Sequence, residues 1–512
     1  MAPTVGLRDI VNVASRNVPS SADLIFLVVA PVTAFLRTVK LTQSDGDLAA
    51  HIRMGDAILT TGILPGHSLA SYTAATDTMV AQAWLSEVVF SVLHRLGGLP
   101  LLVVVTAILI AATHASVAIF LRRKGADPRW ALLAALISLA ISSTHWLTRP
   151  HMFSITGVLL TLYVLESGSN RKWLAFLVLY GLWANLHGAW LYGLVVCVLY
   201  VAGGLAEAVF DSRARVSWLL GVRSNVTGLG AAALGTLMTP HGLRLNGEVL
   251  RSATDPAIAS HMAEFLPPNF QEAAALPFLG ATLLSVTILA VARERMPLPW
   301  LAVVVFGFFA SLSSFRNIAL FGVSAWPLIA LHASRALPPA RRKFPFFREF
   351  AALDHESRVG ILAGPVAILL LLLGLNRGRV GGAELMPRQF DQKVFPVAAV
   401  GKARTARLEG RIFGSWPWGG YIMYSWPGAR VHVDPLKFNR RTMRSYSLIR
   451  DARPGWNDEL ARWNVRTIII ESDSRLAREL AHDPRWKTWY RDSTAVVFRP
   501  AGGGYSAPRA VP

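Results

Sequence analysis

The residues with the clearest chemical potential lie in the stretch SDGDLAAHIRMGD, residues 44–56. Asp45 and Asp47 are two positions apart, and His51 follows Asp47 by four, so on a helix Asp47 and His51 share a face. A carboxylate here could act as a general base, and the carboxylate pair with the histidine could hold a divalent cation. The structural alternative is a helix N-cap, because Asp47 stands just before an apolar-periodic stretch.

Cationic and polar side chains recur at the ends of several apolar runs. Arginine can bind phosphate oxygens through two parallel hydrogen bonds, so such residues could clamp an anionic group. The candidates for substrate contacts are Arg149, His151, His187, His241, Arg244, Glu264 and Arg316. Each has a structural alternative, since arginines at membrane ends also anchor to lipid headgroups and histidines also serve in helix packing and turns.

A membrane scaffold must position these residues. Of the 512 residues, 53% are hydrophobic and 16% are charged, and the mean hydropathy is +0.41. Soluble domains carry about 25% charged residues. The longer apolar runs match the ~20 residues that cross ~30 Å of hydrocarbon as a helix. We predict eleven transmembrane helices, at residues 24–39, 99–121, 130–147, 152–165, 173–186, 190–210, 226–238, 276–291, 298–312, 318–331 and 359–375.

Basic residues are distributed unevenly around these runs. With the N-terminus in the cytoplasm, the cytoplasmic loops collect most of the lysines and arginines of the membrane part, including residues 122–124 and the run at 335–358. This positive-inside bias indicates that the net charge of +20 reflects membrane insertion rather than nucleic-acid binding. The first residues are too polar for a cleaved signal peptide, so we interpret the run at 24–39 as a retained anchor. The single cysteine, Cys197, excludes an intramolecular disulfide.

The same topology gathers the candidate residues on the outer side. It exposes two long loops, at 40–96 and 239–275, and the short segments TRPH, NLHG and SFRN. Polar residues gathered at one side suggest a cavity that faces that side. The first loop is predicted to contain a helix that begins near Asp47 and stops at Gly62, followed by an amphipathic stretch, QAWLSEVVFSVLHRLGG, in the interface plane.

The composition changes after the last run. WGGYIMYSW and ARVHVDP are predicted strands, as are residues 465–471 and 494–498, with helices at 440–451 and 456–463. His432 and Asp434 are interpreted as a strand end and turn. We therefore predict an α-helical polytopic membrane domain at 1–378, a small α/β extracytoplasmic domain at 379–500 and a disordered tail at 501–512.

These features together resemble the GT-C superfamily, polytopic glycosyltransferases that use polyprenyl-phosphate-linked donors. In that superfamily a catalytic aspartate opens the first outer loop and precedes a juxtamembrane helix that commonly ends at a glycine, and Asp47 and Gly62 fit this layout. The chain also resembles a group of mostly uncharacterised bacterial multi-pass proteins related to these enzymes. The shared motifs are RPHMFS, WANLHGAW, TPHGLRL, SFRNIALFG, WPWGGYIMY and VHVDPLKF. This chain departs from the group at Ser68 and at Gln82-Ala83, where acidic and His-Glu residues are common, which puts an acid or metal role of that cluster in doubt.

The resemblance implies a membrane glycosyltransferase of the bacterial cytoplasmic membrane. It would move a sugar from a polyprenyl-phosphate-linked donor to a glycan, lipid or protein acceptor on the outer face, with the C-terminal domain in the periplasm. Asp47 and Asp45 would be catalytic, a divalent cation (Mg²⁺ or Mn²⁺) could sit between them, and His51 joins the substrate contacts named above. A glycan polymerase or ligase on the same scaffold differs only in its acceptor. The alternatives from other classes are a non-catalytic assembly protein for envelope glycans and a lipid-linked glycan transporter or flippase.

Overall fold

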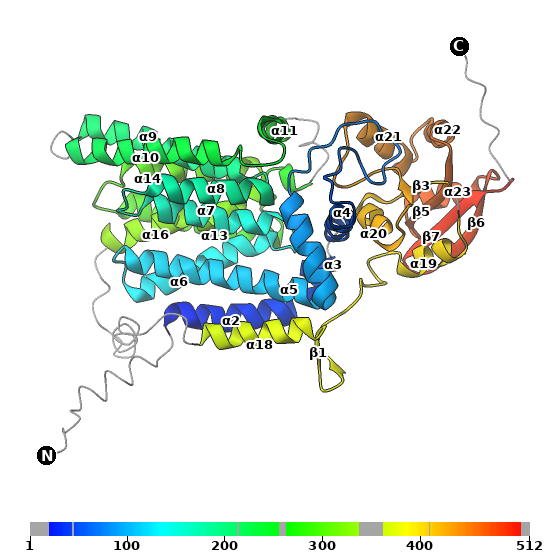
Figure 1. Ribbon diagram of the computed structural model, residues 1–512, viewed down its shortest axis with the longest axis horizontal. Coiled ribbons are helices and arrows are strands. Elements are labelled where there is room, and N and C mark those ends of the chain that lie inside the picture. The colour runs from blue at the N-terminus through cyan, green and yellow to red at the C-terminus, as the bar shows by residue number, and fades with distance from the viewer. Residues whose placement is uncertain are drawn as a thin grey trace, which may run out of the picture.

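A computed structural model describes residues 20–43, 46–211, 215–254, 263–336, 362–408 and 410–502. It has a bundle of helices along its long axis and a smaller part with a β-sheet at one end (Figure 1). Three features treated above lie outside the described residues: Asp45, most of the predicted tail, and the first 19 residues. The same is true of most of the basic run at 335–358.

The bundle is built from fifteen described helices, and each predicted apolar run falls on one or two of them. They are α2 (Ser21–Leu36), α3 (Thr38–Gln43), α4 (Asp47–Thr61), α5 (Trp84–Arg123), α6 (Pro128–Ser142), α7 (His151–Leu165), α8 (Lys172–Leu186), α9 (Trp190–Phe210), α10 (Arg215–Gly235), α11 (Leu243–Thr254), α13 (Leu276–Val291), α14 (Leu298–Ser313), α15 (Ile318–Val323), α16 (Ala325–Ala336) and α18 (Ala363–Leu375). Short 3₁₀ turns join some of them: η1 (Ser143–His145), η2 (Ala263–Phe265), η3 (Ala273–Ala275) and η4 (Phe315–Asn317).

Three stretches of the described residues are long and apolar enough to cross a membrane. They are α5, α9 and the continuous segment Ala273–Val291. The segments Phe315–Val323 and Ala325–Ala336, bent by 41° at their junction, form a fourth if counted as one span. The count of eleven transmembrane helices therefore stays a prediction, because five of the other apolar helices have only 10–17 residues.

The amphipathic stretch of the first loop is the opening part of α5. Its backbone turns sharply at Gly98, where φ is 69° and ψ is −160°, and the apolar part of the helix follows. The predicted helix after residue 46 is α4, which packs against α5 and ends at Gly62 in the left-handed conformation. Gly62 has a φ of 68°, which glycine adopts without the steric penalty of a Cβ atom. A glycine at this position therefore explains why the helix ends here.

The C-terminal part is a five-stranded sheet with helices around it. Its strand order is β4-β3-β5-β7-β6, with β3 parallel to β4 and β5, and β7 antiparallel to β5 and β6. The strands are β3 (Arg411–Gly414), β4 (Arg430–Val431), β5 (Val465–Glu471), β6 (Trp486–Arg491) and β7 (Ala495–Pro500). The helices are α19 (Val397–Thr405), α20 (Trp416–Ser425), α21 (Arg440–Arg450), α22 (Trp456–Arg462) and α23 (Arg475–His482). A two-stranded hairpin of β1 (Arg379–Val380) and β2 (Ala383–Glu384) precedes them.

One secondary-structure prediction for this part was wrong. WGGYIMYSW is helical, as α20, and only Arg430–Val431 of the neighbouring predicted strand pairs in the sheet, as β4. Pro417 stands in the first turn of α20, where proline favours a helix start. The two glycines that weaken the helical pattern in the sequence lie against backbone: Gly419 near Val433 and Gly420 near Gly46. The predicted strand at 465–471 and the helices near 440 and 456 are confirmed, and β7 covers the predicted strand at 494–498.

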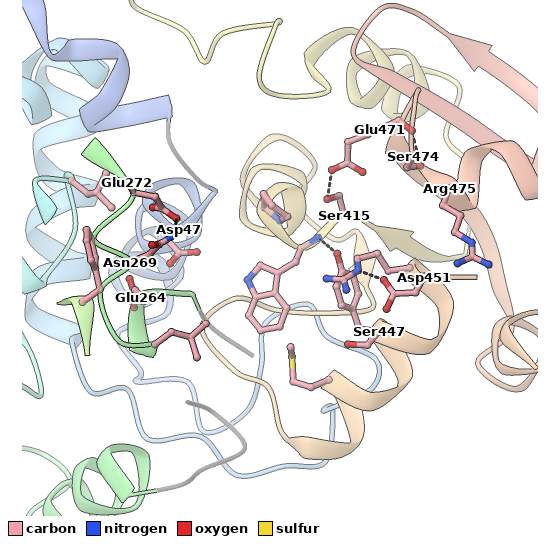
Figure 2. A pocket seen from close by; sticks show the side chains of 18 of the residues that line it. Asp47, Glu264, Asn269, Glu272, Ser415, Ser447, Asp451, Glu471, Ser474 and Arg475 are labelled. Atoms are coloured by element: carbon pink, nitrogen blue, oxygen red, sulfur yellow. Dashed lines mark hydrogen bonds and ion pairs between the residues drawn. The ribbon is translucent and has the colours of Figure 1, made fainter. Parts of the chain in front are cut away.

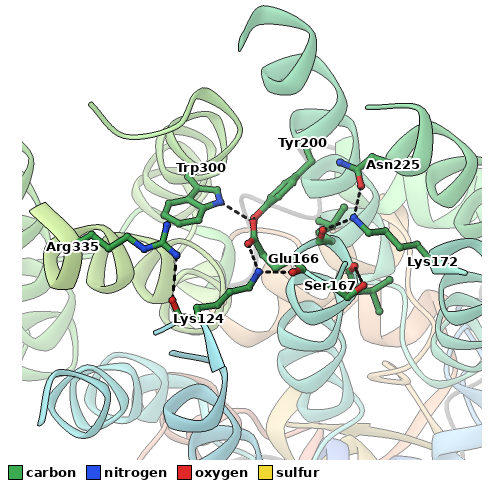
Figure 3. A network of polar contacts seen from close by, with 10 residues as sticks. Lys124, Glu166, Ser167, Lys172, Tyr200, Asn225, Trp300 and Arg335 are labelled. Atoms are coloured by element: carbon green, nitrogen blue, oxygen red, sulfur yellow. Dashed lines mark hydrogen bonds and ion pairs between the residues drawn. The ribbon is translucent and has the colours of Figure 1, made fainter. Parts of the chain in front are cut away.

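A polar network joins the helices at the end of the bundle remote from the sheet (Figure 3). The Glu166 carboxylate accepts hydrogen bonds from the Tyr200 hydroxyl at 3.0 Å and from the Trp300 indole at 2.8 Å, and it pairs with the Lys124 ammonium at 2.8 Å. Arg335 donates to the Lys124 carbonyl at 3.2 Å and lies over the Trp300 ring. These contacts connect the ends of α5, α7, α14 and α16 to the middle of α9, and they fix the bundle opposite the candidate site.

Candidate active site

A large cavity lies where the bundle meets the C-terminal part. Its volume is about 1620 Å³. Figure 2 shows Asp47, Glu264, Asn269 and Glu272 on one side of it, with residues of the C-terminal part across the open space. The cavity is large enough for an extended substrate, since ligand pockets commonly measure about 300–1,000 Å³.

Four charged residues form a connected array on the bundle wall. Arg149 Nη2 lies 3.1 Å from Asp47 Oδ2, and Arg149 Nη1 lies 3.6 Å from Glu264 Oε2. Arg316 Nη1 lies 3.8 Å from the other oxygen of Glu264. The four side chains are between 17% and 27% exposed; Asp47, Arg149 and Glu264 line the cavity, whereas Arg316 is held beside it by Glu264. In the sequence they stand in four separate segments, and the fold brings them together.

Local structure accounts for the place of each charge. Asp47 is the first residue of α4, and its predecessor Gly46 lies against α20. Arg149 precedes α7, where the Arg149 amide donates to the Leu147 carbonyl at 2.8 Å in a tight turn. Glu264 belongs to η2, and its carbonyl accepts a hydrogen bond from the Ser314 hydroxyl at 3.1 Å. This contact joins the second long loop to the segment that carries Arg316.

Arg316 is held by an aromatic ring as well as by charge. Its guanidinium lies over the Phe265 ring, 4.5 Å from the centroid. A guanidinium stays protonated in proteins, so Arg316 is a permanent cation beside the cavity.

Three histidines lie beside Arg316. His145, His151, His187 and Arg316 line a small hollow of about 30 Å³. His151 Nε2 donates to the His145 carbonyl at 2.8 Å, and His187 Nδ1 is 2.7 Å from the Ser154 hydroxyl. His145 also lines the large cavity, with Nε2 3.9 Å from Glu264.

The opposite wall comes from the C-terminal part. Its polar and aromatic residues are Ser415, Trp416, Tyr446, Ser447, Arg450, Asp451, Arg453, Glu471, Ser474 and Arg475. The Ser415 hydroxyl donates to Glu471 at 2.5 Å, and the Trp416 amide donates to the Tyr446 hydroxyl at 2.8 Å. An aromatic face among hydroxyl and carboxylate groups suits a polar, ring-containing ligand.

Comparison with solved structures identifies this architecture. The archaeal oligosaccharyltransferase AglB from Archaeoglobus fulgidus, in complex with an inhibitory peptide and a dolichol-phosphate, is similar at a TM-score of 0.50 and 15% identity over 87% of this chain and 69% of AglB. The same enzyme tethered to an acceptor peptide gives a TM-score of 0.51 at the same identity and coverage. AglB belongs to the GT-C superfamily. The chain has the GT-C fold.

The other comparisons add little to this result. ArnT from Cupriavidus metallidurans bound to undecaprenyl phosphate is similar at a TM-score of 0.47 and 13% identity, over 93% of this chain and 97% of ArnT. No family model matches the sequence, and no curated protein matches it. The GT-C fold is therefore recognised from structure, at an identity too low to transfer an activity.

Within the GT-C fold, some predicted site residues lie apart from the array. His51 Nδ1 is 3.2 Å from Glu87, and both side chains are buried between α4 and α5. His241 and Arg244 stand at the start of α11 and, in the described part of the chain, line neither of the two hollows. Asp47 and His51, which were predicted to share a helix face, therefore have different partners. Asp47 pairs with Arg149, and His51 contacts Glu87.

Sequence reasoning missed His145 and the whole C-terminal wall. His145 stands four residues before Arg149, close enough to the TRPH motif to have been included. Trp416 belongs to the WPWGGYIMY motif, but the prediction of a strand from Trp418 onward missed that Trp416 opens the helix α20 at the cavity edge. Tyr446, Asp451 and Glu471 carry no local signal, because only the fold brings them to the cavity.

The HVDP segment docks the first long loop onto the C-terminal part. Asp434 accepts a hydrogen bond from the Ser68 hydroxyl at 2.5 Å, and His432 Nδ1 is 3.0 Å from the Tyr72 hydroxyl. Both groups are buried. Burial raises the pKa of Asp434 to about 6 and lowers the pKa of His432 to about 3. This geometry agrees with the structural interpretation of His432 and Asp434.

The described residues do not fit a divalent cation at Asp47. Among them, no group of three or more His, Cys, Asp or Glu side chains is arranged to hold a metal ion. The carboxylates of Asp47 and Glu264 are bridged by the Arg149 guanidinium, which is itself a cation. The prediction that Asp45 and Asp47 share Mg²⁺ or Mn²⁺ stays a prediction, because Asp45 lies outside the described residues.

Proposed function

We propose that this chain is a membrane glycosyltransferase that moves a sugar from a polyprenyl-phosphate-linked donor to an acceptor on the outer face of the bacterial cytoplasmic membrane. The observation that carries this proposal is the charged array beside the ends of the apolar helices. Asp47 and Arg149 line the large cavity, and Glu264 links Arg149 to Arg316, which lines the adjoining small hollow. The GT-C fold supports it, since AglB was solved with dolichol-phosphate and with an acceptor peptide.

The array matches the requirements of this reaction. The bond between the sugar and the phosphate breaks, and the phosphate leaves with the electron pair, so strong acid assistance is not needed. Arg149 and Arg316 stabilise the charge that develops on the phosphate oxygens. Asp47 accepts the proton of the acceptor hydroxyl or amine as the new bond to the sugar forms. Glu264 lies between the two arginines, where it balances their charge before the phosphate enters.

The proposal includes an orientation. The N-terminus lies in the cytoplasm, residues 1–378 form the membrane domain, and residues 379–500 form a periplasmic domain. The network around Glu166 would then lie at the cytoplasmic end and the cavity at the periplasmic end, in agreement with their opposite places in the molecule.

One observation favours a second candidate, a non-catalytic assembly protein of the same fold. Asp47 and Arg149 form an ion pair at 3.1 Å, which a purely structural pair would also form. The two candidates differ in ligand binding, because only the enzyme requires a lipid phosphate beside Arg149 and Arg316.

The test uses the full chain in nanodiscs of neutral lipid, scanned thermally with and without undecaprenyl phosphate. We expect the lipid to stabilise wild type and Asp47→Asn, but not Arg316→Ala. Arg171→Ala, at an exposed arginine before α8, is the matched control and should respond as wild type does. If none of the four proteins is stabilised, the assembly-protein candidate takes precedence.

A further inference from the structure

The C-terminal part carries a second hollow with a marked charge. It is a groove of about 600 Å³ formed by residues of α21 and α22. The described lining has four arginines and one carboxylate: Arg440, Arg441, Arg444, Arg462 and Glu459, with Ser445 and Leu448 between them. Such a surface attracts an anion, and guanidinium groups fit the paired oxygens of phosphate and carboxylate.

Aromatic and polar contacts hold the side chains of this groove in place. Arg441 lies over the Trp463 ring, 5.1 Å from its centroid. The Trp463 indole donates to Glu459 at 2.7 Å and to the buried Ser445 hydroxyl at 3.0 Å. Arg462 pairs with Glu459 at 3.6 Å but remains 63% exposed, so its guanidinium is still open to a ligand.

Helix α21 separates this groove from the proposed active-site cavity. Arg440, Arg441 and Arg444 face the groove, whereas Tyr446 and Arg450 line the cavity. At 100° per residue these two sets lie on opposite sides of the helix. A ligand that lies across α21 could therefore occupy both hollows at once.

We propose that the groove binds the anionic part of the acceptor, a glycan that carries phosphate or carboxylate groups. This inference rests on the proposed function and names its acceptor class. The glycan's reactive end would enter the cavity, where Arg475 lines the wall and two arginines, Arg450 and Arg453, share the single carboxylate of Asp451. A membrane surface is a poorer partner, because α22 lies far from the helix bundle along the long axis of the molecule (Figure 1).

The test measures binding of two fluorescent probes to the full chain in neutral nanodiscs. One probe is an oligogalacturonate of about six units, and the other is a glycerol-phosphate oligomer of similar length; a neutral malto-oligosaccharide serves as the reference ligand. The variant is Arg441→Glu with Arg444→Glu. The matched control is Arg478→Glu with Arg499→Glu, which changes the net charge equally at exposed arginines outside both hollows.

We expect at least one anionic probe to bind wild type and the control at least tenfold more tightly than it binds the groove variant. Added salt should weaken this binding, and the malto-oligosaccharide should not discriminate among the proteins. Circular dichroism and the thermal midpoint check that the variant is folded. Binding of undecaprenyl phosphate, measured in the same samples, should be the same for all three proteins.

The lipid measurement separates the two proposals. If wild type binds undecaprenyl phosphate but neither anionic probe, the acceptor inference is wrong and the proposed function stands. If the lipid phosphate does not bind, the proposed function fails whatever the probes do. If the groove variant instead loses binding to anionic-lipid vesicles while it keeps both probes, the groove docks on a membrane, which also overturns the inference.

Discussion

Gly46 and Gly420 meet through their backbones. A Cβ atom on Gly420 would lie 2.1 Å from the Gly46 carbonyl oxygen, and one on Gly46 would lie 2.2 Å from the Pro417 carbonyl oxygen. The start of α4 is thus seated against α20 of the C-terminal part, one residue before Asp47. The position of the proposed base depends on the C-terminal part as well as on the bundle.

Gly420→Ala should therefore separate α4 from α20. We expect a loss of stability of about 1–3 kcal/mol, typical of overpacking, because the added Cβ would meet the Gly46 backbone and the Ala50 Cβ atom, neither of which can rotate away. The measurement is thermal unfolding of the detergent-solubilised protein. Gly401→Ala is the control, since nothing lies within 4 Å of its added Cβ. Equal midpoints for the two variants would contradict the contact.

Glu264→Gln should strengthen the binding of undecaprenyl phosphate. The change removes a negative charge that lies 3.6 Å from Arg149 and 3.8 Å from Arg316, so the phosphate no longer competes with this carboxylate for the two cations. We expect a gain of about fivefold in affinity, which corresponds to ~1 kcal/mol. Glu272→Gln is a matched control in the same cavity, where its carboxylate accepts a hydrogen bond from Asn269. Weaker binding would mean that Glu264 instead holds the two arginines in place.

Asp434→Asn should change how stability depends on pH. The folded pKa of Asp434 is about 6, above its ordinary value of 3.8, so the folded state binds the proton more tightly than the unfolded state. The contribution of Asp434 to the free energy of unfolding is present at low pH and is lost as the pH rises from about 4 to about 6. Asparagine keeps partners for Ser68 and the Leu436 amide without the buried charge.

The variant should therefore be more stable than wild type at pH 7.5, by as much as ~3 kcal/mol, with the difference vanishing near pH 4. Thermal midpoints of both proteins across this range give the measurement, and Asp473→Asn, at an exposed residue, is the control. A difference that grows as the pH falls would have the wrong sign and exclude this account.

Glu166→Ala should destabilise the bundle. It would leave the Tyr200 hydroxyl, the Trp300 indole and the Lys124 ammonium without the carboxylate that joins them (Figure 3). We expect a cost of about 3 kcal/mol, since partly buried polar and charged groups lose their partner. Thermal unfolding gives the measurement, with Glu294→Ala, at an exposed carboxylate, as the control. The affinity for undecaprenyl phosphate of the protein that remains folded should be unchanged.

Local patterns were sufficient for several elements and for the residue types of the site. The apolar period after Asp47 and the glycine at its end predicted α4, and the β-branched run at 465–471 predicted β5. Arg149 and Arg316 could be nominated because they stand at the ends of apolar runs, whereas Asp47 and Glu264 were nominated from the layout of the GT-C superfamily. These features depend on residues that are close neighbours in the chain, so they can be predicted from the sequence alone.

Tertiary packing decided the rest. The motif WGGYIMYSW fits a strand or a helix by its pattern; in the fold it is the helix α20, which places Gly420 against the backbone of Gly46. The orientation of His51 depended on Glu87, a residue 36 positions away. The sequence by itself determined which side chains could do chemistry. Only the fold decided that Asp47, Arg149 and Arg316 come together in one charged array beside the cavity, because the distances between them are set by helices that no local pattern places.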